Sequence, residues 1–268
     1  MSTILTHLLE FAHPCCFVRY PRFGLPFVLH CIVVFALCFS VEAGSQSPES
    51  ADLRAAQAVS RLEGFLDIPY REDGAVDLKG RYTRFDAQEV FFDTPGLNCS
   101  GLLVAAGRAL FSRPFTLKDA TWDRLGDSGP GAKLGHDWDF GKDLVLNLAG
   151  DRSPTELIPA GADHLPGRGF RISDDETLAA AIASMRPGFV YLASISKPTG
   201  RRPYRVLYYH VGLFVPDEQG SVWFYHSTPK NNVHRMQVSH PRGREWFHFQ
   251  FAPSQVGEKY ILIYAVTL

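Results

Sequence analysis

The sequence predicts an α+β domain in which helices come first and a mainly antiparallel sheet follows. Apolar residues recur at helical spacing in the first half, and six short β-type segments, separated by turn residues, come after Gly188. Hydrophobic residues make up 46% of the 268 residues and charged residues 21%, which is typical of a globular protein with a buried core.

Residues 1–43 are predicted to be a signal peptide for export. An apolar run from Phe27 to Phe39 follows Arg19 and Arg22, and it is shorter than the roughly 20 residues of a membrane-spanning helix. Small residues near Ala43 suit a cleavage site. An uncleaved membrane anchor is the alternative, and it is the only contact with a membrane that we expect. The predicted location is periplasmic or extracellular.

Removal of this segment would leave one cysteine. Four of the five cysteines lie in residues 1–43, and the fifth is Cys99. A disulfide within the chain then becomes impossible, and a lone thiol in an oxidising compartment is a hazard unless it is buried or used. Cys99 is therefore the first candidate for a functional residue.

A linker is predicted over residues 44–55 and a folded domain over 56–268, with an insertion at about 115–185. Apolar spacing predicts a helix that reaches into the linker, and a run of small apolar residues predicts a second helix that starts near Cys99. Weaker patterns predict three more, the last with Asp174 or Asp175 near its start. The expected helices cover residues 51–65, 99–111, 120–126, 142–148 and 176–185.

The second half of the chain reads as β-structure. Its segments alternate or run apolar, and Pro, Gly, Asn and Asp clusters separate most of them. The expected strands cover residues 189–194, 205–215, 221–226, 232–238, 246–252 and 260–266. We expect the helix that begins at Cys99 to pack on one face of this sheet.

The segment Asn98-Cys99-Ser100-Gly101 places a thiol at the first turn of a buried helix. A helix N-terminus favours a thiolate through its dipole and its free N–H groups. Two histidines, His210 and His226, follow far downstream in strand-like runs. One cysteine followed by two strand-borne histidines predicts a cysteine hydrolase that works by nucleophilic catalysis.

Five segments taken in order carry a family resemblance. They are Ile68–Arg71, Asn98–Gly101, Arg186–Gly188, Tyr209–Phe214 and Phe224–Ser227. Together they resemble the NlpC-type cysteine peptidases, papain-like enzymes that cut the peptide stems of bacterial peptidoglycan. The resemblance implies a papain-like fold, an exported thiol protease or other hydrolase of the cell wall, and no cofactor or metal.

The resemblance also implies roles for single residues. Cys99 would be the nucleophile, His210 the general base, and His226 the residue that orients the His210 ring. The Cys99 backbone N–H and the Tyr70 hydroxyl would stabilise the oxyanion, and Ser100 would touch the substrate or cap the helix. Because the closing position of this fold can also be Asn, residues 231–232 are alternatives to His226.

Two residues depart from the family's pattern. Asn98 stands where the family has Asp, and Phe189 follows Gly188 where the family again has Asp. Asn can still cap a helix, so the first change leaves the predicted helix start intact and removes one negative charge beside the thiol. Both changes weaken the inference about the substrate more than the inference about the family.

The expected partner is a peptidoglycan peptide or another amide. A formal net charge of -1 makes nucleic acid an unexpected partner. The residues of 136–139 (His-Asp-Trp-Asp) lack the spacing of a metal site. The alternatives are an amidase or acyltransferase of the same fold acting on a non-wall substrate, and a non-catalytic module that binds the cell wall.

Overall fold

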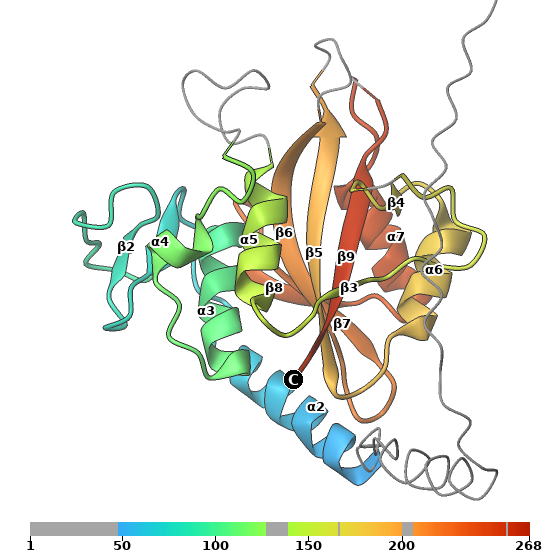
Figure 1. The fold of residues 1–268 in the computed structure, drawn as a ribbon, viewed down its shortest axis with the longest axis horizontal. Helices are drawn as coiled ribbons and strands as arrows, with labels where there is room; N and C mark the ends of the chain where they lie inside the picture. The colour runs from blue at the N-terminus through green and yellow to red at the C-terminus, as the bar shows by residue number, and fades with distance from the viewer. Residues whose placement is uncertain (1–47, 127–138, 166, 200–205, 256) are drawn as a thin grey trace, which may run out of the picture. The chain divides into compact units, whose positions relative to one another are not determined.

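A seven-stranded sheet with helices on both faces organises the protein in the computed structural model (Figure 1). The structure describes residues 48–126, 139–165, 167–199, 206–255 and 257–268. The predicted signal peptide, residues 1–43, lies outside the described residues. Among the described helices, none is both long and apolar enough to cross a membrane.

Every ladder between the strands of the main sheet is antiparallel. The strand order is β3-β9-β5-β6-β7-β8, and β4 also pairs with β9. A separate hairpin joins β1 (Gly74–Val76) and β2 (Tyr82–Arg84). The main strands are β3 (Thr155–Glu156), β4 (Phe170–Arg171), β5 (Phe189–Pro198), β6 (Val206–Pro216), β7 (Val222–Thr228), β8 (Asn232–Gln237) and β9 (Tyr260–Thr267).

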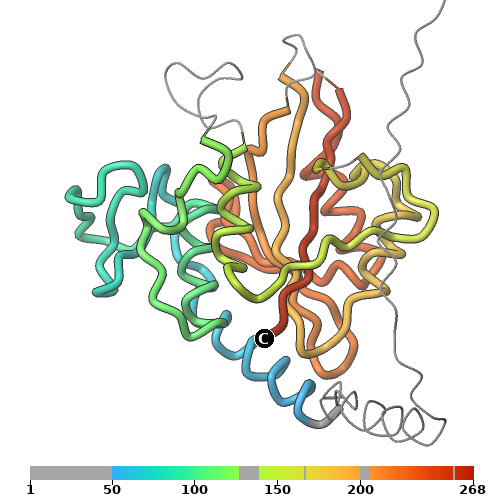
Figure 2. The backbone as a smooth tube through the Cα atoms, in the orientation of Figure 1, coloured from blue at the N-terminus to red at the C-terminus, as the bar shows by residue number. Residues whose placement is uncertain are grey.

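Two layers of helices bury the two faces of this sheet. The helices are α2 (Pro48–Glu63), α3 (Cys99–Phe111), α4 (Leu117–Ala120), α5 (Phe140–Ala149), α6 (Asp175–Ser184) and α7 (Pro241–Gln250). The first four share one apolar cluster with β6, and α6 and α7 share a second cluster with the opposite face (Figures 1 and 2). The predicted α+β class, with helices packed on a mainly antiparallel sheet, is confirmed.

Alternation along β6 assigns its side chains to these two layers. Val211, Leu213 and Val215 pack in the layer of α3. His210 lies opposite Ile195 of β5, and Ile195 packs in the layer of α7. The two neighbours His210 and Val211 therefore direct their side chains to opposite faces of the sheet.

The prediction of a strand over residues 246–252 is wrong, because these residues belong to α7 and the turn that ends it. Phe247, Phe249 and Phe251 alternate with polar residues, which suggests a strand. In the helix, Phe247 and Phe251 lie four residues apart and are buried, whereas Phe249 is 72% exposed. His240 caps this helix and Pro241 begins it.

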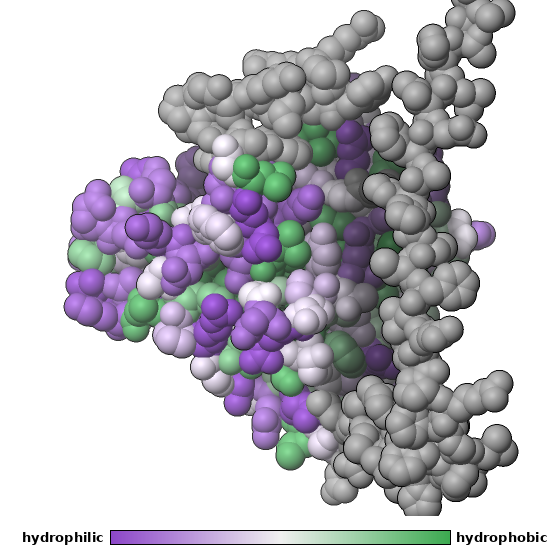
Figure 3. Space-filling model, viewed as in Figure 1, coloured by the Kyte–Doolittle hydropathy of each residue, from purple (hydrophilic) through white to green (hydrophobic). Residues whose placement is uncertain are grey.

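The first half differs from prediction in two places. Helix α2 begins at Pro48, inside the segment predicted as a linker. The helix predicted over 120–126 is instead a single turn over Leu117–Ala120, held by a capping box at Thr116. The helix predicted over 142–148 is confirmed as α5, which packs in the core of the sheet. The outer surface over β2 and α4 is mainly hydrophilic (Figure 3).

Candidate active site

The N-terminus of α3 is fixed by the residue before Cys99. Asn98 has extended backbone angles, and its side-chain oxygen accepts a 2.7 Å hydrogen bond from the Gly101 N–H. The Asn98 N–H donates to the Gly74 carbonyl over 3.0 Å. These bonds satisfy groups that a helix start leaves free, so they hold the first turn, and Cys99 with it, against β1.

Gly101 allows this close approach. A Cβ atom at this position would collide with the carbonyl oxygen of Gly74 and would also crowd the Cα atom of Ala75. The residues of α3 that follow are almost all buried. The motif Asn-Cys-Ser-Gly is therefore explained in part by packing: the glycine is needed for the helix to reach the β1–β2 hairpin.

The Cys99 thiol is half-buried between α3 and β6. Burial raises its pKa above the usual value, and hydrogen bonds from the Val211 backbone N–H and the Ser100 hydroxyl offset only part of that effect. The Ser100 Oγ lies 4.0 Å from the sulfur. The helix N-terminus was expected to favour the thiolate, but desolvation outweighs it, so the resting thiol is protonated.

His210 and His226 contact each other directly. The His210 Nε2 lies 3.1 Å from the His226 Nδ1, and the rings meet edge to face. Burial and the charge of Lys259 lower the pKa of His210 to about 4. Burial, with the charges of His210 and His234, holds the pKa of His226 well below its usual value. Both rings are neutral at pH 7.

This contact brings His226, and not the alternative residues 231–232, next to His210. His226 lies beside His210, as the resemblance implies. The side chain of Asn232 instead accepts a hydrogen bond from the Tyr70 N–H over 3.1 Å. The backbone N–H of Asn231 donates to Thr228 in the turn between β7 and β8.

The thiol reaches the strand that carries His210. Its hydrogen-bond donor, Val211, is the next residue of β6. In the described sheet, β6 pairs with β7 only from Leu213 to Pro216, so the two strands part before they reach this point. Within the described residues, the sulfur makes no hydrogen bond to the imidazole of either His210 or His226. Catalytic hydrogen bonds often close only when substrate binds.

The Tyr70 hydroxyl lies close enough to Cys99 for a thiolate there to raise the pKa of the hydroxyl. Burial comes first in raising the pKa of its hydroxyl, followed by the charges of Cys99 and Glu72. The hydroxyl therefore keeps its proton and can donate it. A backbone bridge to Leu97 holds Tyr70 beside the segment that leads into α3.

A cleft of about 740 Å³ lies between the β1–β2 hairpin, α4, the start of α5 and the start of β6. Tyr209 lines this cleft, and burial, with a smaller contribution from the charge of Cys99, raises the pKa of its hydroxyl to about 12. Among the described residues that line the cleft, Tyr209 is the one whose pKa responds to Cys99, and Cys99, His210 and His226 themselves are not part of the lining. Phe85, Phe140 and Leu207 give it an apolar wall, and Asp73, Asp86 and Lys118 give it charged groups.

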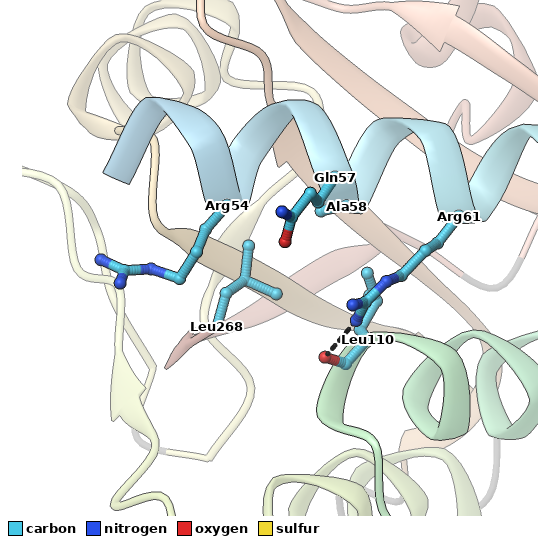
Figure 4. A pocket seen from close by; sticks show the side chains of 6 residues that line it. All are labelled: Arg54, Gln57, Ala58, Arg61, Leu110 and Leu268. Atoms are coloured by element: carbon cyan, nitrogen blue, oxygen red, sulfur yellow. Dashed lines mark hydrogen bonds between the residues drawn. The ribbon is translucent and has the colours of Figure 1, made fainter. Parts of the chain in front are cut away.

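A smaller cavity of about 180 Å³ lies between α2 and the ends of α3 and β9 (Figure 4). Arg61 crosses it and donates to the carbonyl oxygens of Ala109 and Leu110 at the end of α3. Arg54, Gln57 and Leu268 also line it, and no cysteine or histidine of the described ranges does. We assign this cavity to the packing of α2.

His234 is a neighbour of the site that the sequence analysis passed over. It lies directly opposite His226 in the β7–β8 ladder, with ring centroids 4.2 Å apart. The signal was present in the sequence: the two histidines are equally far from the turn around Pro229 and Lys230. Counting the register from that turn pairs them across the hairpin.

Among the residues that the structure describes, no group of three or more His, Cys, Asp or Glu side chains is arranged to hold a metal ion. Residues 136–138 of the His-Asp-Trp-Asp segment lie outside that part of the chain. The sequence matches no family model, and searches of curated proteins and of solved structures also give no match.

Proposed function

We propose that the protein is an exported cysteine hydrolase with a papain-like arrangement, which cleaves an amide bond in peptidoglycan stem peptides. The observation that carries the proposal is the pairing of two features at one strand. The capped N-terminus of α3 brings the Cys99 sulfur to the Val211 N–H, and the preceding residue, His210, is hydrogen-bonded to His226. The candidate nucleophile thus contacts the residue next to the candidate base, whose ring lies on the other face of β6 and contacts the orienting group.

The protonation states suggest how the reaction begins. Both the thiol and the imidazole are neutral at rest, because burial raises the pKa of Cys99 and lowers that of His210. We therefore expect His210 to take the thiol proton as the sulfur attacks the amide carbon, instead of a thiolate standing ready beforehand. The resulting imidazolium is stabilised by the lone pair of the His226 Nδ1.

The later steps use the same groups. Attack forms the C–S bond and places a negative charge on the carbonyl oxygen, which the Cys99 N–H and the Tyr70 hydroxyl would stabilise. Breakage of the C–N bond releases an amine that takes the proton from His210, and a thioester remains on Cys99. Water, deprotonated by His210, then hydrolyses the thioester and regenerates the thiol.

The cleft supports an extended, partly polar substrate. It combines the aromatic rings of Phe85 and Phe140, in edge-to-face contact, with charged groups at its border. Asp73 and Asp86 are both bonded to Arg84, which leaves one net negative charge in that group. A peptide that carries both apolar and charged side chains fits this lining better than a purely apolar chain does.

The test is digestion of purified peptidoglycan by the protein, analysed by mass spectrometry, with Cys99→Ala as the control. We expect new stem-peptide fragments that disappear in the control and in His210→Ala. Fragments that persist with Cys99→Ala would refute the mechanism. Binding to peptidoglycan without any fragment would instead favour a non-catalytic wall-binding module, and release of acyl groups from other amides would favour a different substrate.

A further inference from the structure

Three histidine rings form a row on strands β6, β7 and β8. His210 and His226 are joined by the 3.1 Å contact, and His226 packs against His234 with ring centroids 4.2 Å apart. His226 is fully buried, His210 is nearly so, and His234 is half-buried. We call His210, His226 and His234 the histidine row.

The outer end of the row has a fixed tautomer. The His234 Nδ1 lies 3.1 Å from the backbone oxygen of Asn232. Because a carbonyl oxygen can only accept a hydrogen bond, the Nδ1 of His234 carries the proton. Neutral His234 therefore has an unprotonated Nε2, and its ring can only accept at that atom.

The working state of His210 fixes the other two rings. A base that takes the thiol proton at its Nδ1 must hold its own proton at Nε2, and this N–H then donates to the His226 Nδ1. Neutral His226 must in turn carry its proton at Nε2. The opposite arrangement would leave His210 protonated at Nδ1 and unable to accept from the thiol.

With these protonation states, one N–H group of the histidine row is left without an acceptor. The His226 Nε2 is buried and has no hydrogen-bond partner among the described residues. A buried donor without an acceptor costs about 1–3 kcal/mol. The rings around His226 are those of Phe224, Phe251, His210 and His234. The His234 ring has the nearest centroid of the four, at 4.2 Å, and its Nε2 carries a lone pair.

We propose that His234 is a positioning residue, which stabilises the Nε2–H form of His226 and so keeps His210 in the tautomer that accepts the thiol proton. The proposal rests on the proposed function, because it assigns His210 the role of base. It gives His234 no contact with substrate. Its effect passes through His226.

His234 is the least buried ring of the histidine row, so it is the ring that a change of pH protonates most readily. Burial and the charge of His210 lower the pKa of His234, and its bond to Asn232 opposes them. Of the other charged groups, Lys259 lowers the pKa of His210, and Arg235 follows His234 on β8. The Arg235 guanidinium lies over the Trp223 ring at 4.4 Å and so faces the other layer. Protonation of His234 would remove its lone pair and add a charge beside His226.

The first test needs no variant. Nitrogen-15 NMR of the protein reports which ring nitrogen of each histidine is protonated. We expect Nε2–H for His210, Nε2–H for His226 and Nδ1–H for His234 at pH 7.5. A His210 ring protonated at Nδ1 in the resting protein would overturn the proposal.

The second test compares His234→Leu with His234→Gln. Leucine fills the space without an acceptor, and glutamine keeps an acceptor oxygen. We measure Cys99 alkylation by iodoacetamide from pH 5.5 to 9 together with the His210 tautomer. We expect alkylation about tenfold slower in His234→Leu, with His210 shifted toward Nδ1–H, and a rate within about threefold of the parent protein in His234→Gln.

The controls separate this proposal from the proposed function. If His210→Ala alkylates at the parent rate, then His210 is not the base and the proposed function fails. If His210→Ala is slow but His234→Leu keeps both the parent rate and the parent tautomer, only the role of His234 fails. Equal losses in His234→Leu and His234→Gln, with no change of tautomer, would show a packing role and would also overturn the proposal.

Discussion

The cysteine corner (Asn98, Cys99, Gly101 and Gly74) and the histidine row are both largely buried, but they satisfy their polar atoms in different ways. At the corner, the Asn98 side chain accepts from Gly101, its N–H donates to Gly74, and the Cys99 sulfur accepts from Val211. In the row, the His226 Nε2 is buried with no partner among the described residues.

The difference separates two tasks. The corner is held by hydrogen bonds of backbone and amide groups that do not titrate, so its geometry should be independent of pH. The row is held by rings whose hydrogen bonds depend on where each proton lies. The corner therefore sets the position of the sulfur, and under the proposed function the row determines where the thiol proton can go.

The largest effect should come from Gly101→Ala at the corner. The added methyl group would collide with the Gly74 carbonyl, which is backbone and cannot rotate away. We expect the free energy of unfolding to fall by about 3 kcal/mol or more, measured by urea denaturation.

Gly107→Ala in the same helix is the matched control. Its Cβ would lie 3.3 Å from the end of the Leu148 side chain, which can shift. Alanine also favours the helix, so we expect a change within about 1 kcal/mol. Equal losses in both variants would show that α3 does not depend on its approach to Gly74.

The second largest effect should be a fall in the free energy of unfolding in acid, because the buried His210 resists protonation. The pKa of His210 is lowered to about 4 in the fold, and an unfolded histidine has a pKa of about 6.5. The stabilisation from a neutral His210 is therefore complete above pH 6.5 and is lost as the pH falls toward 4. We expect His210→Gln to lose about 2 kcal/mol less than the parent protein between pH 7 and pH 5, measured by urea denaturation.

His240→Asn is the control for this pH series. His240 is an exposed histidine that caps α7, and asparagine can keep the cap. Its stability should follow the parent protein's pH dependence. If His210→Gln follows it as well, the row does not carry the acid sensitivity.

The same contrast explains what could be predicted from the sequence. The corner is local: a cap residue, a cysteine, a glycine and a run of small apolar residues lie next to each other, and the start of α3 at Cys99 is confirmed. The order of the strands and the desolvation of the thiol depend on contacts between distant segments. The sequence pattern therefore could not show that burial raises the pKa of Cys99.

The errors in the predicted fold also arise from contacts between distant segments. The period of the phenylalanines around Phe249 suited a strand, and only the packing of Phe247 and Phe251 beneath the sheet selects the helix. His234 carries no motif and becomes visible through the register of the β7–β8 hairpin. The pairing of His210 with His226 was expected from the resemblance, whereas the pairing of His226 with His234 required the structure.

The smallest effect, and the most informative for the corner, comes from Asn98. Asn98→Ala removes the 2.7 Å cap and should lower the free energy of unfolding by about 1 kcal/mol. Asn98→Asp keeps the acceptor and places a carboxylate at a helix N-terminus, which should stabilise the protein by a few tenths of a kcal/mol. The same negative charge should raise the pKa of Cys99 further and slow its alkylation at pH 7.5.

Asp174→Asn is the matched control, because Asp174 caps α6 by accepting from the Thr177 N–H over 3.0 Å and lies on the other face of the sheet. This variant should change stability slightly and leave the alkylation rate of Cys99 unchanged. Faster alkylation in Asn98→Asp would mean that the carboxylate orients the His210 imidazolium more than it repels the thiolate. Asparagine at this position would then lower the reactivity of the thiol relative to aspartate. Slower alkylation would instead mean that Asn98 preserves the helix start and eases ionisation of the thiol.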